Sequence, residues 1–220
     1  MRRTALALLL ALLFLSCKES RSVPPPSADV PIFIISIDTL RSDRLPIYGY
    51  RGVQTPNIDA LRADGILYEH AYAHTPLTLP SHTSLFTGLL PADHGVRDNI
   101  GYSLKDGVPT IAELLKTRGY ATGAAVSSFV LRAETGVARG FDFYEDDVEA
   151  MAGKARFIGN IQRVGGATVS VASEWIAKQQ KPVFFFLHLY DPHTPYEAPE
   201  PFRSQYANRY DGEIAYSDHV

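Results

Sequence analysis

The chain has 220 residues, with 21 Lys and Arg against 24 Asp and Glu, which gives a formal net charge of −3. This balance excludes a strongly basic nucleic-acid-binding protein, and a hydrophobic content of 45% excludes a wholly disordered chain. The single cysteine, Cys17, excludes an intramolecular disulfide and a multi-cysteine zinc site.

Residues 1–17 predict an export signal. Two arginines are followed by an apolar run from Ala5 to Leu15 and then by Ser16 and Cys17. A basic start and a short apolar core are typical of a secretory signal, and the run is shorter than the about 20 residues that span a membrane. The segment before Cys17 resembles the lipobox of bacterial lipoproteins, whose cysteine carries lipid. A plain secretory signal with an incidental cysteine is the alternative, so we expect a periplasmic or membrane-anchored bacterial protein.

Apolar runs predict the strands of one domain over residues 31–220, which follows a Pro- and Ser-rich tether at residues 18–30. Residues 30–37 form a near-continuous apolar run rich in β-branched side chains. This pattern is typical of a strand buried on both faces of a parallel sheet. Residues 183–189 are a second such run, and residues 120–126 are a weaker third.

Helical patterns lie between these runs. Residues 56–63 begin with a proline that suits a first helical turn, and residues 110–117 end just before Gly119, which suits a C-cap. Residues 166–180 carry apolar side chains on one helical face. Strands that alternate with helices predict an α/β layered fold.

Asp38 directly follows the first predicted strand. In open parallel sheets, ligands bind beyond the carboxyl ends of the strands, and a carboxylate placed there can bind a divalent metal. An Asx turn or a helix cap is the structural alternative for an aspartate at this position.

The segment at residues 78–88 reads TLPSHTSLFTG. Pro80 suits the first turn of a helix, so we expect Thr78 at the helix N-terminus, where free N–H groups favour an anion. A threonine hydroxyl attacks poorly unless a base or a metal lowers its pKa. Asp38 with a metal would supply that activation; the alternative is that Thr78 only caps the helix.

A third polar segment, residues 188–196, follows the run at residues 183–189 and reads HLYDPHTPY. Its histidines and aspartate form a plausible polar site at the carboxyl end of a strand. His193 is expected to bind an anionic oxygen or to protonate a leaving group. The alternative is a Pro-rich loop in which the histidine packs on Tyr196.

Five segments resemble, in order, those of the sulfatase-like hydrolases of the alkaline phosphatase superfamily, and the similarity covers residues 31–220. They are residues 37–50, 55–65, 78–88, 139–144 and 191–196. The resemblance implies a three-layer sandwich of alkaline-phosphatase type with a mostly parallel central sheet, here truncated at the C-terminus. It also implies a divalent-metal site in which Asp38 is a ligand and Thr78 is the nucleophile that touches the metal. His193 would contact a substrate oxygen or assist the leaving group.

The resemblance includes departures from the sulfatases that use formylglycine. Those enzymes carry Cys or Ser where this chain has Thr78, which cannot be converted, and His82 replaces their arginine. Residues 78–99 resemble instead the nucleophile segment of nucleotide pyrophosphatase/phosphodiesterases, which use threonine. In those enzymes the asparagine that matches Asn99 binds the developing oxyanion, so we expect Asn99 to bind substrate.

These features predict an exported, metal-dependent hydrolase of sulfate or phosphate esters that forms a covalent intermediate on Thr78, with an anionic ester as its substrate. Ca²⁺, Mg²⁺, Mn²⁺ and Zn²⁺ all stay open as the metal. Relatives complete the metal site with an Asp-His or Asp-Asn pair after a later strand. Asp218 and His219 lie in a helical pattern and are not expected to be that pair. Two alternatives are a transferase that passes a phospho-group to a surface glycan or lipid, and a non-catalytic truncated lipoprotein.

Overall fold

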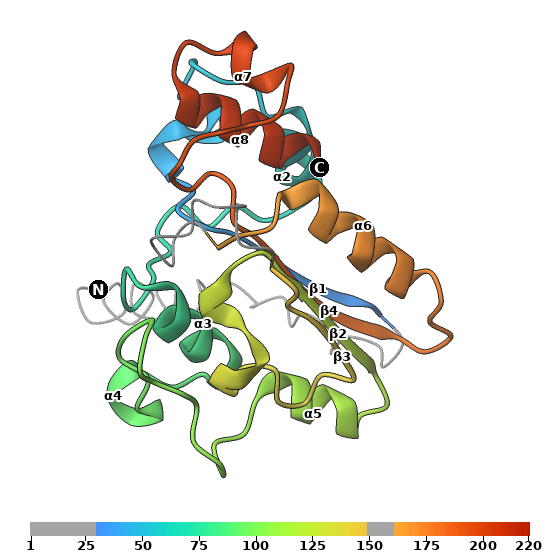
Figure 1. The fold of residues 1–220 in the computed structure, drawn as a ribbon. Helices are drawn as coiled ribbons and strands as arrows, with labels where there is room; N and C mark the ends of the chain where they lie inside the picture. The colour runs from blue at the N-terminus through green and yellow to red at the C-terminus, as the bar shows by residue number, and fades with distance from the viewer. Residues whose placement is uncertain (1–29, 149–160) are drawn as a thin grey trace, which may run out of the picture.

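The computed structural model describes residues 30–148 and 161–220; the predicted export signal and the tether up to residue 29 lie outside these ranges. Within these ranges, four strands form one sheet in the order β1-β4-β2-β3, and every neighbouring pair is parallel (Figure 1). The strands are β1 (Ile32–Ile37), β2 (Ala121–Val126), β3 (Phe143–Glu145) and β4 (Val183–Leu189). The three predicted strands are confirmed. The sequence does not predict β3, because three residues are too few to show an alternation.

The predicted helices begin within one residue of their predicted first residues. The helices of the described residues are α2 (Pro56–Asp64), α3 (Thr78–Thr87), α4 (Pro91–His94), α5 (Ile111–Thr117), α6 (Gly165–Ile176), α7 (Phe202–Gln205) and α8 (Arg209–His219). Short 3-10 turns are η2 (Ser42–Arg44), η3 (Pro46–Tyr48), η4 (Phe129–Leu131) and η5 (Ala133–Thr135). α5 begins behind a capping box of Thr110 and Glu113. α6 ends at Ile176 and not at the predicted residue 180. Just after this end, the Gln179 side chain donates to the carbonyl of Trp175 at 2.8 Å.

Helices cover both faces of the sheet, which confirms the predicted three-layer α/β architecture (Figure 1). On one face, Ala172 of α6 packs against Phe185 of β4. On the other face, α3 packs against Phe186 and α5 packs against Phe184. The three phenylalanines alternate because successive strand side chains point to opposite faces, so β4 is buried on both faces as predicted.

A second packed cluster lies beyond the carboxyl ends of the strands. There α2, α7 and α8 gather with the segment that follows β1, at the top of Figure 1. Its core combines Leu45 and Val53 from that segment with Tyr210 and Ile214 from α8. The Tyr210 hydroxyl also donates to the carbonyl of Thr39 at 2.6 Å. The cluster therefore holds the loop that begins at the end of β1.

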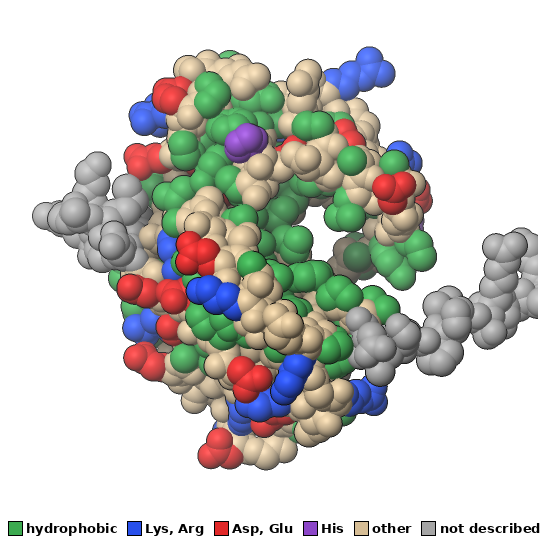
Figure 2. All heavy atoms as spheres, turned by 90° about the vertical axis from the view of Figure 1, so that its right-hand side faces the viewer, with side chains coloured by type: hydrophobic (Ala, Val, Ile, Leu, Met, Phe, Trp, Pro, Cys, Tyr) green, Lys and Arg blue, Asp and Glu red, His purple; other side chains and the backbone are tan. Residues whose placement is uncertain are grey.

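β1 is less buried than its sequence predicts. It lies at the edge of the sheet, and Phe33 and Ile35, which share the α6 side with Phe185, are 49% and 58% exposed. α6 packs on β2 and β4 and leaves this face of β1 open, so the prediction of a strand buried on both faces is wrong for β1. Hydrophobic side chains also surround a hollow on one face of the molecule (Figure 2). Among the described residues, no helix has the length and the apolar character that crossing a membrane requires.

Candidate active site

The carboxyl end of β1 and the N-terminus of α3 bring Asp38 and Thr78 together. The Thr78 hydroxyl donates a hydrogen bond to Asp38 Oδ2 across 3.3 Å. Asp38 is held in place because its N–H donates to the carbonyl of Leu189 at 2.9 Å. Thr78 is the first residue of α3, so its side chain lies at the helix N-terminus, where the helix dipole favours an anion. A hydroxyl, a carboxylate and a helix N-terminus therefore meet at the edge of the sheet.

Thr39 turns the chain sharply after Asp38. Among the described residues it is the only one other than glycine with a positive φ, at 55°, which is unfavourable for a β-branched side chain. Its hydroxyl donates to the carbonyl of Pro192, and its own carbonyl accepts from the Tyr210 hydroxyl. These contacts hold the unfavourable conformation and connect the Asp38 loop to the loop that carries His193.

Asn99 lies against the first turn of α3. Its side-chain Oδ1 accepts a hydrogen bond from the N–H of Leu79 at 2.9 Å, whereas Leu77, the residue before the helix, offers no side-chain cap. Because Oδ1 is engaged, the N–H donors on Nδ2 are the part of Asn99 that can bind an anion beside Thr78. The structure thus places the predicted substrate-binding amide next to the predicted nucleophile.

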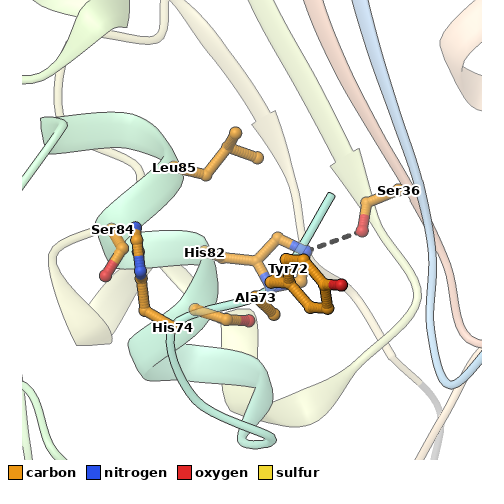
Figure 3. A pocket seen from close by; sticks show the side chains of 8 residues that line it. Ser36, Tyr72, Ala73, His74, His82, Ser84 and Leu85 are labelled. Carbon is orange, nitrogen blue, oxygen red and sulfur yellow. Dashed lines mark hydrogen bonds between the residues drawn. The ribbon is translucent and has the colours of Figure 1, made fainter. Parts of the chain in front are cut away.

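His82 supports Thr78 from the following turn of α3. Its Nδ1 lies 2.7 Å from the carbonyl oxygen of Thr78, and its Nε2 lies 2.8 Å from Ser36 Oγ (Figure 3). Burial, and then the neighbouring His188, lower the pKa of His82 to about 4, so the ring is neutral at pH 7. A neutral ring that donates from Nδ1 accepts at Nε2, so the Ser36 hydroxyl is the donor there. An uncharged side chain therefore joins α3 to β1 at the position where the resemblance would place an arginine.

A cavity of about 460 Å³ adjoins His82 (Figure 3). Its lining comes from β1, α3 and the segment before α3: Ser36, Tyr72, Ala73, His74, Ser81, His82, Ser84 and Leu85. Neither Asp38 nor Thr78 lines it. The cavity is therefore not the place where a ligand would meet the Thr78 hydroxyl.

His188 approaches Asp38 from β4. It pairs with Ser36 in the β1-β4 register, so its side chain lies on the α3 face of the sheet, as do those of Ser36 and Asp38. The ring is fully buried, and its Nε2 lies 3.6 Å from Asp38 Oδ2. Within the described part of the chain, neither ring nitrogen has a hydrogen-bond partner.

Asp38 is negatively charged at neutral pH although it is largely buried. Burial acts to raise the pKa of its carboxyl group, but the close approach of His188, followed by His193, outweighs this effect. The pKa of Asp38 therefore lies below its usual value. An ionised carboxylate is the form that binds a metal ion.

His193 lies in the loop after β4. Its ring stacks on Tyr190 with 4.2 Å between the ring centroids, and its Nδ1 lies 2.8 Å from the carbonyl oxygen of Thr194. The stacking partner is thus Tyr190 and not the Tyr196 that the sequence suggested, because Tyr196 packs edge-on against Tyr210. Its Nε2 lies 3.4 Å from the Tyr190 hydroxyl oxygen, a long contact that a substrate oxygen would have to replace.

Asp218 and His219 end α8, in agreement with their helical pattern. Asp218 Oδ1 accepts from the N–H of Ile58 at 2.8 Å, and Oδ2 accepts from the N–H of Asn57 at 3.2 Å. The carboxylate therefore caps the N-terminus of α2 from a distant part of the sequence.

Asp38 Oδ2 and Thr78 Oγ1 are the atoms that fit a divalent cation, since oxygen donors of this kind bind such ions. In residues 30–148 and 161–220, no group of three or more His, Cys, Asp or Glu side chains forms a metal site. The sequence predicts His188 only as part of a polar site at the end of a strand, and it predicts no role for the ring of His82. The two-residue alternation within residues 183–189 is the signal for His188, because it places this side chain on the face of Phe186.

The fold is that of the alkaline-phosphatase-like proteins. A protein of the alkaline phosphatase superfamily from Vibrio parahaemolyticus superposes with a TM-score of 0.67 at 24% identity, over 87% of this chain and 48% of that one. The sulfatase family model matches residues 31–220. The chain belongs to the sulfatase family, which confirms the resemblance found in the sequence.

Two further proteins show how much of a relative the chain covers. Human arylsulfatase A is 37% identical over 99 residues, which are 43% of this chain and 20% of the relative. The phosphonate monoester hydrolase of Agrobacterium radiobacter superposes with a TM-score of 0.65 at 22% identity, over 80% of this chain and 43% of that one. The chain thus spans about half the length of the solved structures, and its matched part is about a fifth of the curated relative.

Proposed function

We propose that Thr78 is the nucleophile of a divalent-metal-dependent enzyme that hydrolyses sulfate or phosphate esters. The observation that supports it is the Thr78 hydroxyl, which lies in the first turn of α3 and donates to the Asp38 carboxylate. A side-chain oxygen held at a helix N-terminus suits attack on an anionic centre. The signal predicted at residues 1–17 would export this activity, and Cys17 would anchor it by lipid.

The proposed reaction has two displacement steps. In the first, Thr78 Oγ1 bonds to sulfur or phosphorus and loses its proton along the hydrogen bond to Asp38, while the bond to the ester oxygen breaks. His193 gives a proton to the departing alkoxide, which leaves as an alcohol. In the second step, water attacks sulfur or phosphorus and gives a proton to His193, the bond to Thr78 Oγ1 breaks, and the proton held by Asp38 returns to Thr78 Oγ1.

Charge that grows on the transferring group meets donors that are already in place. The positive end of the α3 dipole and the Nδ2 group of Asn99 would face this charge, since Asn99 Oδ1 is held by Leu79. A divalent cation at Asp38 and Thr78 supplies, when bound, a lower pKa for the hydroxyl and neutralisation of the substrate anion.

The proposal includes both sulfate and phosphate esters. The human relative is named an arylsulfatase, and one structural neighbour is named a phosphonate monoester hydrolase. Both kinds of ester present a tetrahedral anionic centre to the same nucleophile. Thr78 stands where the resemblance would place a formylglycine precursor, so the substrate preference of this chain needs its own measurement.

The proposal is tested on the purified full-length protein with nitrophenyl sulfate, nitrophenyl phosphate and bis-nitrophenyl phosphate, each with Ca²⁺, Mg²⁺, Mn²⁺ or Zn²⁺. Thr78→Ala is expected to lower kcat/KM at least about a thousandfold. Thr87→Ala, at the other end of α3, is the matched control and is expected to keep it. Acid-quenched wild type should carry a sulfo- or phospho-group on Thr78 in peptide mass spectra. Wild-type activity in Thr78→Ala would exclude this nucleophile.

A further inference from the structure

His188 is a buried polar side chain that has no role in the reaction proposed above. Its ring is fully buried, and it belongs to β4, which lies between β1 and β2 in the sheet. Neither nitrogen is hydrogen-bonded within the described ranges. A buried polar group without a partner destabilises a fold, so its presence calls for a ligand that the chain itself does not supply.

The neighbours of His188 restrict what that ligand is. The ring of His82 lies 5.1 Å away between centroids, but both of its nitrogens are engaged elsewhere. Phe186, at 6.3 Å between centroids, offers no polar atom. Asp38 remains, and its Oδ2 lies 3.6 Å from His188 Nε2, which is too long for an ordinary hydrogen bond. His188 Nε2 therefore faces a carboxylate without a hydrogen bond to it, which suits a cation shared by the two side chains.

The distances around Asp38 Oδ2 also suit a shared cation. Thr78 Oγ1 lies 3.3 Å from this oxygen, and His188 Nε2 lies 3.6 Å from it. Ligands bound to one ion at about 2.0–2.4 Å lie roughly 3.0–3.7 Å apart when they occupy neighbouring positions. The three atoms come from the residue after β1, from α3 and from β4, and both distances from Asp38 Oδ2 fall within this range.

We propose that His188 Nε2 is a third protein ligand, with Asp38 and Thr78, of the divalent cation in the proposed active site. Imidazole suits Zn²⁺ and other transition metals, whereas Ca²⁺ and Mg²⁺ take oxygen ligands. The site therefore prefers an ion such as Zn²⁺ or Mn²⁺ to Ca²⁺. This inference rests on the metal dependence in the proposed function, but it does not depend on which ester is cleaved.

Metal binding by the full-length protein tests the inference without an activity assay. Metal-free wild type, His188→Gln and His188→Leu are titrated with Zn²⁺ and Mn²⁺ in a calorimeter, and both variants are expected to bind more than about tenfold more weakly. Electron spin echo envelope modulation of the Mn²⁺-loaded wild type should show a coordinated imidazole nitrogen. Both variants should lose this signal. Two substitutions are made so that a folding defect in one does not decide the result.

His94→Gln is the matched control. His94 is as buried as His188, but its Nε2 lies 3.0 Å from Ser84 Oγ and its Nδ1 accepts from the N–H of Val96 at 3.1 Å. Its substitution is expected to lower the unfolding temperature and to leave the metal affinity and the nitrogen signal unchanged. His188→Leu should lower the unfolding temperature of the metal-free protein less than His94→Gln does, because neither nitrogen of His188 makes a hydrogen bond within the described ranges.

Wild-type affinity for Zn²⁺ and Mn²⁺ in folded His188 variants would overturn the inference. So would bound Mn²⁺ without an imidazole signal in the wild type, or a wild type that binds neither ion. A different experiment decides the proposed function: esterase activity retained in Thr78→Ala would contradict it. Ester hydrolysis that needs Thr78, together with unchanged metal affinity in both His188 variants, would exclude the His188 ligand alone.

Discussion

The side chain of Asn99 completes the first turn of α3 and also presents donors to an anion. Its Oδ1 accepts the Leu79 N–H, which would otherwise lack a partner, because Leu77 supplies no cap. Its Nδ2 group carries the hydrogen-bond donors. The two ends of one amide thus have separable roles, in stability and in substrate binding.

Asn99→Asp should separate these roles. A carboxylate oxygen still accepts from Leu79, so the free energy of unfolding is expected to change by less than about 0.5 kcal/mol. The donors are lost and a negative charge faces an anionic transition state, so kcat is expected to fall about a hundredfold or more. Asn99→Ala should lose both functions, with a stability loss of about 1 kcal/mol. Urea unfolding and steady-state kinetics measure the two effects, and an unchanged kcat in Asn99→Asp would contradict a role in substrate binding.

At the scale of secondary-structure elements, local signals predict where elements begin, and distant contacts decide their burial. The prolines at positions 56 and 80 mark the starts of α2 and α3, and the end of the first apolar run predicts the position of Asp38. Residues 30–37 and 183–189 have similar composition, yet their burial differs because β1 lies at the edge of the sheet and β4 at its centre. Strand register likewise brings His188 to Asp38, and no local pattern contains this information.

The cap on α2 is a contact that the sequence conceals. Asp218 reaches it from the last turn of α8 and accepts the N–H groups of Asn57 and Ile58. Asp218→Ala is expected to lower the free energy of unfolding by about 1–2 kcal/mol, because two N–H groups lose their acceptor. His219→Ala, at the exposed neighbouring position, should change it by about 0.5 kcal/mol or less. Urea denaturation compares the two variants, and equal effects would mean that the cap does not stabilise the fold.

At the scale of the whole molecule, the buried side chain of Glu213 links the helix cluster beyond the strands to the loop after β4 and, through Asp191, to the start of α6. Glu213 of α8 is 2% exposed and lies beside Asp191, whose Oδ2 accepts the N–H of Gly165 at 3.0 Å at the start of α6. Burial, followed by the charge of Asp191 and a hydrogen bond with it, raises the pKa of Glu213 to about 8. Glu197 acts in the same direction through its charge. Glu213 is therefore protonated in the folded protein at pH 7.

This protonation predicts how the stability of the molecule depends on pH. An unfolded glutamate has a pKa near 4.5, so between about pH 4.5 and 8 the folded chain holds a proton that the unfolded chain releases. The contribution of Glu213 to the free energy of unfolding is thus complete below this range and is lost as the pH rises through it. Glu213→Gln should match wild type near pH 4 and become more stable than wild type as the pH rises, by about 4 kcal/mol near pH 8. Glu174→Gln, on the exposed side of α6, is the control and should follow the wild-type pH profile. Urea unfolding at a series of pH values decides the matter, and a Glu213→Gln profile parallel to wild type would show that Glu213 titrates alike in both states.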